Sequence, residues 1–266
     1  MFSSAIIGYT LHLADNALIL GHRNSEWTGH GPILEQDIAL SNIALDLIGQ
    51  ARNFYQLAAG MINGTRGTRA WPAVGGDKAE VTEDDLAYLR DGWDFRNCLL
   101  VEQPNGDWGA TVLRQFFFSA YQFYFYGELR NCRHAEIAAI AEKSLKEVTY
   151  HLRWSGEWVI RLGDGTDQSA GRMKKAMDHL WQFTGELFEP AGYERELLAE
   201  AIAVDLPAIR PLWDQRVREV LGAARLAAGS DVWMQTGGKQ GKHTEHLGYL
   251  LAEMQFLQRA YPGCEW

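Results

Sequence analysis

Apolar residues recur at steps of three and four along most of this 266-residue chain, which is the spacing of an amphipathic helix. The pattern predicts a first helix over 5–22. A long second helix is predicted to begin after Pro32 and to end at the turn signal Asn63-Gly64. Residues 63–80, rich in Gly, Thr and charge, are predicted to form a loop whose role the sequence leaves open.

The rest of the chain repeats the helical spacing between clear breaks. Further helical segments are predicted over 83–101 (as short pieces), 107–130, 134–162, 167–187, 205–221 and 243–260. Asp167 or Ser169 is expected to cap the fourth of these segments, and Asp205 followed by Pro207 is expected to start the fifth. No stretch alternates as a strand does, and no linker divides the chain. The sequence therefore predicts a single all-α domain, 1–266, built on long antiparallel helices.

The charge balance narrows the classes of partner. The chain has 25 Lys and Arg against 34 Asp and Glu, a formal net charge of −9. An acidic chain is a poor ligand for nucleic acid or for an anionic membrane, because both require cationic groups. Its three cysteines fit a reducing cytoplasm. No run approaches the roughly 20 apolar residues of a spanning helix. We therefore expect a cytoplasmic protein that binds neither nucleic acid nor membrane.

A long helical bundle with buried polar residues raises the question of a carboxylate-bridged di-iron site. Such a site takes a Glu from each of two helices and a Glu-x-x-His pair from each of the other two. No intact pair occurs at a suitable position: Asp46 is followed three residues later by Gly49. Glu147 is followed by Tyr150, and His151 lies one residue late, displaced by about 100° around the helix.

Two explanations remain open for these residues. They are remnants of a degenerate di-iron site, or they are buried polar groups that hydrogen bonds and ion pairs hold together. We expect that this chain contains no catalytic residue, binds no metal and has no cofactor. The remnant set is Asp46, Glu147, Tyr150 and His151.

The segment 236–248 is the most distinctive part of the chain. Its glycines do not have the spacing of a phosphate loop, and its histidines do not form the zinc-protease motif. A Gly-rich loop that enters a helix suggests an interface or capping role, with anion binding as an alternative. The candidate interface or anion-contact residues are Lys239, His243, Glu245 and His246. A metal site shared by His243, His246 and Glu253 is a further alternative.

Motifs spread over nearly the whole chain also carry a family resemblance. They are Ala14-Asp15-Asn16, Glu26-Trp27-x-Gly29-His30, Asp37-Ile38-Ala39-Leu40, Leu45 through Asn53, Leu100 through Gly106, Tyr150-His151-Leu152-Arg153, Arg161 through Asp167, Thr236 through Gly248, and Leu251 through Gln255. On these motifs the chain resembles the PaaC family, the non-catalytic, ferritin-like C subunits of the bacterial phenylacetyl-CoA epoxidase.

The resemblance implies a ferritin-like long-helix bundle with extra flanking helices. It also implies a partner, a homologous catalytic A subunit that carries the di-iron centre and binds the CoA thioester, and a reductase component that supplies electrons. The chain itself would then be a structural subunit of a homo- or hetero-oligomer. Two alternatives stay open: a catalytically active di-iron oxygenase with atypical ligands, and a helical module that binds CoA or the reductase.

Overall fold

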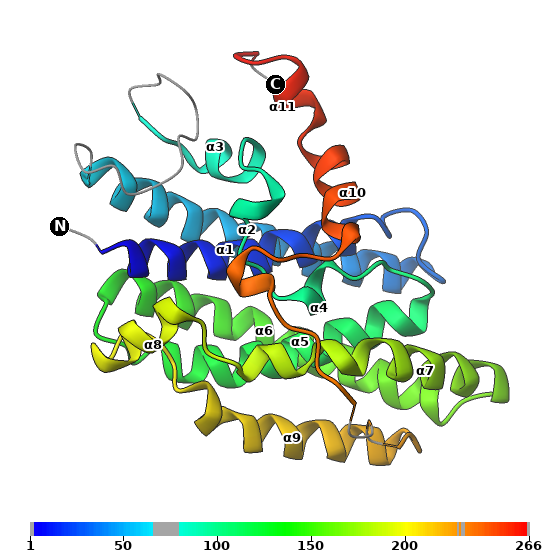
Figure 1. The fold of residues 1–266 in the computed structure, drawn as a ribbon. Helices are drawn as coiled ribbons and strands as arrows, with labels where there is room; N and C mark the ends of the chain where they lie inside the picture. Colours follow the sequence, from blue (N-terminus) through cyan, green and yellow to red (C-terminus); the bar gives the residue numbers. More distant parts are fainter. Residues whose placement is uncertain (1–2, 66–79, 228, 230–231, 265–266) are drawn as a thin grey trace.

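Four long helices, arranged as two antiparallel pairs, position the rest of the chain. The computed structural model describes residues 3–65, 80–227, 229 and 232–264. In it, α1 (Ser4–Ser25) packs along α2 (Leu34–Gly64), and α5 (Trp108–Leu129) packs along α6 (Ala135–Gly163) (Figure 1). Contacts between α2 and α6 join the two pairs. The fold is an all-α, ferritin-like helical bundle, as predicted.

Shorter helices flank this bundle. They are α3 (Glu83–Tyr88), α4 (Leu99–Glu102), α7 (Asp167–Leu180), α8 (Gly192–Ala199), α9 (Leu206–Ala223), α10 (Glu245–Met254) and α11 (Phe256–Ala260), with 3₁₀ turns η1 (Gly92–Asp94), η2 (Trp181–Phe183), η3 (Gly185–Phe188) and η4 (Gly238–Gln240). Helices α7 and α9 contact α5 and α6, while α10 and α11 rise away from the bundle (Figure 1). Among the described residues there is no strand, and no helix is both long and apolar enough to cross a membrane.

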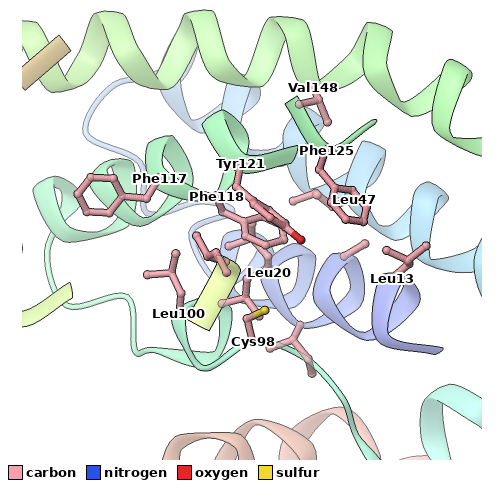
Figure 2. Packing of buried hydrophobic residues seen from close by; sticks show 14 of the residues in the cluster. Leu13, Leu20, Leu47, Cys98, Leu100, Phe117, Phe118, Tyr121, Phe125 and Val148 are labelled. Atoms are coloured by element: carbon pink, nitrogen blue, oxygen red, sulfur yellow. The ribbon is translucent and has the colours of Figure 1, made fainter. Parts of the chain in front are cut away.

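The bundle centre is apolar and aromatic. Figure 2 shows Leu13 of α1, Leu47 of α2, Phe125 of α5 and Val148 of α6 in one cluster of buried side chains. Each is at most 4% exposed. Burying a side chain of this size stabilises the fold by about 1.5–3 kcal/mol, so this cluster is the main reason that the four helices stay together. Helix α1 is buried along most of its length because other elements surround it.

Several boundaries differ from the prediction. Thr166, and not Asp167 or Ser169, caps α7: its hydroxyl accepts from the Ser169 N–H at 3.2 Å in a capping box. Helix α7 ends at Leu180, and 3₁₀ turns replace the predicted helix up to residue 187. The pattern did not predict α8. The predicted helix over 243–260 is divided in the structure: α10 begins only at Glu245, and α11 follows from Phe256.

The predicted loop over 63–80 lies mostly outside the described residues. The described residues on either side of it are joined directly. The Asn63 side-chain amide donates to the Val81 carbonyl, and the Val81 N–H donates to the Asn63 side-chain carbonyl, both at 2.9 Å. This reciprocal pair ties the end of α2 to the segment that leads into α3.

Candidate functional site

The predicted di-iron remnants lie along the contact between α2 and α6. His151 Nε2 donates to Asp46 Oδ2 at 3.0 Å, and the two residues are 105 positions apart in the chain. The His151 side chain is fully buried, whereas the Asp46 side chain is 38% exposed. The other ring nitrogen of His151, Nδ1, has no hydrogen-bond partner among the described residues. The structure thus joins two of the four residues in a direct polar contact.

Glu147 forms a second polar contact one helical turn away. Gln50 Nε2 donates to Glu147 Oε2 at 2.9 Å, and the Tyr126 hydroxyl donates to Gln50 Oε1 at 3.4 Å. Burial raises the pKa of Tyr126, so this phenol stays protonated and can act as the donor. The chain of contacts connects α5, α2 and α6. Tyr150 does not take part in it, since its side chain is exposed beside Arg153.

These residues do not fit a ferritin-like di-iron centre. That centre needs a ligand from each of the four long helices. Helix α5 contains one acidic residue, Glu128, which is exposed near the helix end, and it contains no histidine. Its inward positions are filled instead by residues such as Phe118 and Phe125 (Figure 2). Within the described ranges, no group of three or more His, Cys, Asp or Glu side chains is placed to hold a metal ion.

The Gly-rich segment before α10 surrounds a buried carboxylate. Glu186 Oε1 accepts from the Gly237 N–H at 2.8 Å and from the Lys239 N–H at 3.4 Å, and its Oε2 accepts from the Leu99 N–H at 2.7 Å. Burial raises the pKa of Glu186, while these backbone donors oppose the rise. The acceptor that the loop's backbone N–H groups contact is thus a side-chain carboxyl group of the same protein.

Lys239 is part of the same buried region. Its side chain is 3% exposed, and Nζ lies 3.1 Å from Glu194 Oε2 and donates to the Glu189 carbonyl at 3.0 Å. Glu194 also accepts from the Ala191 N–H at 2.8 Å. The anion that Lys239 contacts in this structure is therefore the chain's own Glu194.

His243 joins the segment to α4. Its Nδ1 donates to Glu102 Oε2 at 2.8 Å, and its Nε2 donates to the Phe95 carbonyl at 3.0 Å. Glu102, fully buried, also accepts from the Thr244 N–H at 2.7 Å and from the Asn97 amide at 2.8 Å. Although burial lowers the pKa of His243, Glu102 and the Phe95 carbonyl raise it overall.

Glu245 and His246 differ from the other two candidate residues of the segment. Glu245 is the first residue of α10 and is exposed. The His246 carbonyl accepts from Arg23 Nη2 at 3.2 Å, and the residue is partly exposed. His243 precedes the helix, so it does not share a helix face with His246 and Glu253. The arrangement does not support the alternative of a metal site there.

Sequence reasoning missed a buried ion pair between Asp15 and Arg90. The Arg90 guanidinium donates to both Asp15 oxygens, and the Asp15 carboxylate also accepts from the Tyr55 hydroxyl at 2.5 Å and the Arg96 N–H at 2.8 Å. Both charged side chains are fully buried. The sequence did carry a signal for such a pair. Asp15 and Glu102 are acids inside apolar helical patterns, and a buried acid usually has a partner.

Comparison with known proteins places these features in a family. The family model for phenylacetic acid catabolic protein (PaaA/PaaC) matches residues 2–266. A relative from Escherichia coli (strain K12), the C subunit of 1,2-phenylacetyl-CoA epoxidase, is 46% identical over 261 residues. The alignment covers 98% of this chain and 99% of that protein.

Proposed function

The chain belongs to the phenylacetic acid catabolic protein family, and on this basis we propose that it is a structural, non-catalytic C subunit of a phenylacetyl-CoA 1,2-epoxidase. In this role it binds and stabilises a homologous catalytic A subunit, which carries the di-iron chemistry of phenylacetate catabolism. The chain acts in the cytoplasm as one ferritin-like domain and needs no cofactor of its own.

The observation that carries the proposal is the composition of α5. A bundle that activates oxygen at two irons needs inward carboxylates or imidazoles on all four long helices. Here α5 offers neither, and its buried positions are taken by aromatic, aliphatic and uncharged polar side chains and by Arg114. Close packing of these apolar side chains favours stability over chemistry.

Asp46, Glu147, Tyr150 and His151 fit this role as remnants of a lost ligand set. Asp46 and Glu147 now hold α2 against α6 through His151 and Gln50. Lys239 and His243 similarly fix the segment before α10 inside the chain, which leaves Glu245 and His246 for contact with a partner. The A subunit is the proposed partner; the reductase component is a second one.

Metal analysis tests the proposal. The purified chain is loaded anaerobically with ferrous iron, desalted and assayed for iron, with the catalytic A subunit treated in the same way as the positive control. We expect iron near zero per chain. About two irons per chain would overturn the proposal, since a di-iron site requires that number. Asp46, Glu147 and His151 would then be the first residues to mutate.

Co-purification with the A subunit tests the second part of the proposal, that this chain binds the catalytic subunit. The two chains are co-expressed with a tag on one of them, and the eluate is analysed by size-exclusion chromatography with light scattering. We expect a stable heteromeric complex. Binding of CoA by this chain alone, without binding of the A subunit, would instead favour a CoA-binding module.

A further inference from the structure

The outer face of α2 carries an apolar row that the described part of the chain leaves uncovered. Leu34 is 71% exposed, Ile38 51%, Leu45 66% and Ile48 40%. With Ser41 between them, these positions follow steps of four, three, four and three residues. This is the heptad spacing with which one helix packs along another. We call these five residues the α2 seam.

The seam is confined to the part of α2 that its neighbours do not cover. Further along α2, Gln56 Nε2 donates to Glu83 Oε1 at 2.9 Å and Arg52 lies 3.5 Å from the same carboxylate, so α3 covers that half. Helix α6 lies along one flank of α2, where His151 meets Asp46. In the described part of the chain, the four apolar seam side chains still face solvent, while Ser41 is partly covered and lies 3.0 Å from the Thr28 hydroxyl.

We propose that the α2 seam binds the corresponding helix of the homologous catalytic subunit. This inference rests on the proposed function and adds the surface of contact. The fourteen steps of helix from Leu34 to Ile48 span about 21 Å, enough for about four turns of a partner helix but too narrow and elongated for a compact ligand. Family members share a fold, so the partner has an equivalent helix to offer.

The charges beside the seam favour a different subunit over a second copy. Glu35, Asp37 and Asp46 lie beside it in the sequence of α2, and the first cation of the helix, Arg52, comes after the seam. Arg52 is also already paired with Glu83. Two copies of this helix would bring net negative charge against net negative charge. A partner helix that carries lysine or arginine beside its own apolar row would complement the negative charge beside the α2 seam.

Charged substitutions in the seam test this surface. Leu45→Asp and Ile38→Asp are compared with Leu212→Asp, in which an exposed leucine (46%) on α9 is changed in the same way. Helix α9 lies on the opposite side of the bundle from α2 (Figure 1). Because all three side chains are exposed, the variants keep the fold, which circular dichroism and thermal melting check. Affinity for the catalytic subunit is measured by titration calorimetry.

We expect each seam variant to weaken binding at least about tenfold and Leu212→Asp to bind as the wild type does. If the wild type binds and both seam variants bind equally well, the seam is not the interface, although the proposed function stands. If the wild type itself does not bind the catalytic subunit, both proposals fail. Loss of a homodimer with unchanged heteromeric binding would assign the seam to a second copy and overturn the inference.

Discussion

His243 and Glu102 are in direct contact, 2.8 Å from Nδ1 to Oε2, although they lie 141 positions apart in the chain. The opposite ring nitrogen donates to the Phe95 carbonyl. Both partners are acceptors, so the contact is complete only when the imidazole carries two protons. The segment before α10 is therefore attached to α4 by a charged histidine.

This arrangement predicts a pH dependence of stability. Glu102 raises the pKa of His243 in the folded protein, so the contribution of His243 to stability is fully present below the unfolded value of about 6.5. It is lost as the pH rises through the folded value. Urea unfolding of the wild type and of His243→Gln should differ by about 1.5–3 kcal/mol at pH 6, and the difference should shrink toward pH 9. His30→Gln, an exposed histidine, is the control. A difference that is constant with pH would contradict the assignment.

Asp46→Ala should affect stability and assembly more than turnover. The substitution removes the acceptor of the buried His151 and should cost about 1 kcal/mol, a modest value because Asp46 is partly exposed. Asp46→Asn keeps an acceptor and should cost less. Chemical unfolding measures both variants. If Asp46→Ala abolished activity in a fully assembled and normally folded complex, the structural role would be wrong.

Asp15→Ala should be far more damaging than the loss of a surface pair. It leaves Arg90 buried without its counter-charge, which costs about 3–5 kcal/mol. Glu83→Ala, which breaks the exposed pair with Arg52, should change stability by no more than about 1 kcal/mol. Should Asp15→Ala fail to fold, Asp15→Asn should give a measurable intermediate loss. Equal effects of Asp15→Ala and Glu83→Ala would refute the prediction.

Two glycines near the C-terminus form a matched pair. A Cβ at Gly238 would lie 2.3 Å from the Asn97 carbonyl oxygen, whereas a Cβ at Gly248 would meet nothing within 4 Å. We expect Gly238→Ala to lose about 1–3 kcal/mol through overpacking. Gly248→Ala, within α10, should be neutral or gain up to about 1 kcal/mol. Thermal unfolding compares the melting temperatures of the two variants, and we expect that of Gly238→Ala to be lower. Similar melting temperatures would contradict this and mean that the loop can move away from Asn97.

His246→Ala examines the partner role of the C-terminal segment. Its side chain is partly exposed at the base of α10, so its removal should leave the fold intact and weaken association with the catalytic subunit. Analytical ultracentrifugation of the mixed subunits measures this. An unchanged complex would count against an interface at His246.

The long helices could be predicted because their signals are local. The periodic apolar positions of α2 and the turn at Asn63-Gly64 lie within one segment, and the structure ends the helix at Gly64. Helix α8 was missed because its eight residues offer little periodicity, with Leu197 as its one fully buried apolar side chain. Short elements of this kind form because tertiary packing holds them.

The polar contacts were less predictable because packing creates them. That Asp46 meets His151 depends on how α2 crosses α6, and that Lys239 meets Glu194 depends on the turns before α10. Neither distance follows from a spacing in the sequence. The lack of a Glu-x-x-His pair, by contrast, is a property of the sequence itself and needs no knowledge of packing.

The late position of residues 237–244 has a consequence for biosynthesis. Glu102, Glu186 and Glu194 all leave the ribosome before Gly237, Lys239 and His243, which supply part of their contacts in the finished fold. Until then, burial of these acidic side chains costs free energy, because some of their hydrogen-bond and ion-pair partners have not yet been made. We therefore expect the buried carboxylates to gain their full set of partners only once residues 237–244 have been synthesised and packed against them.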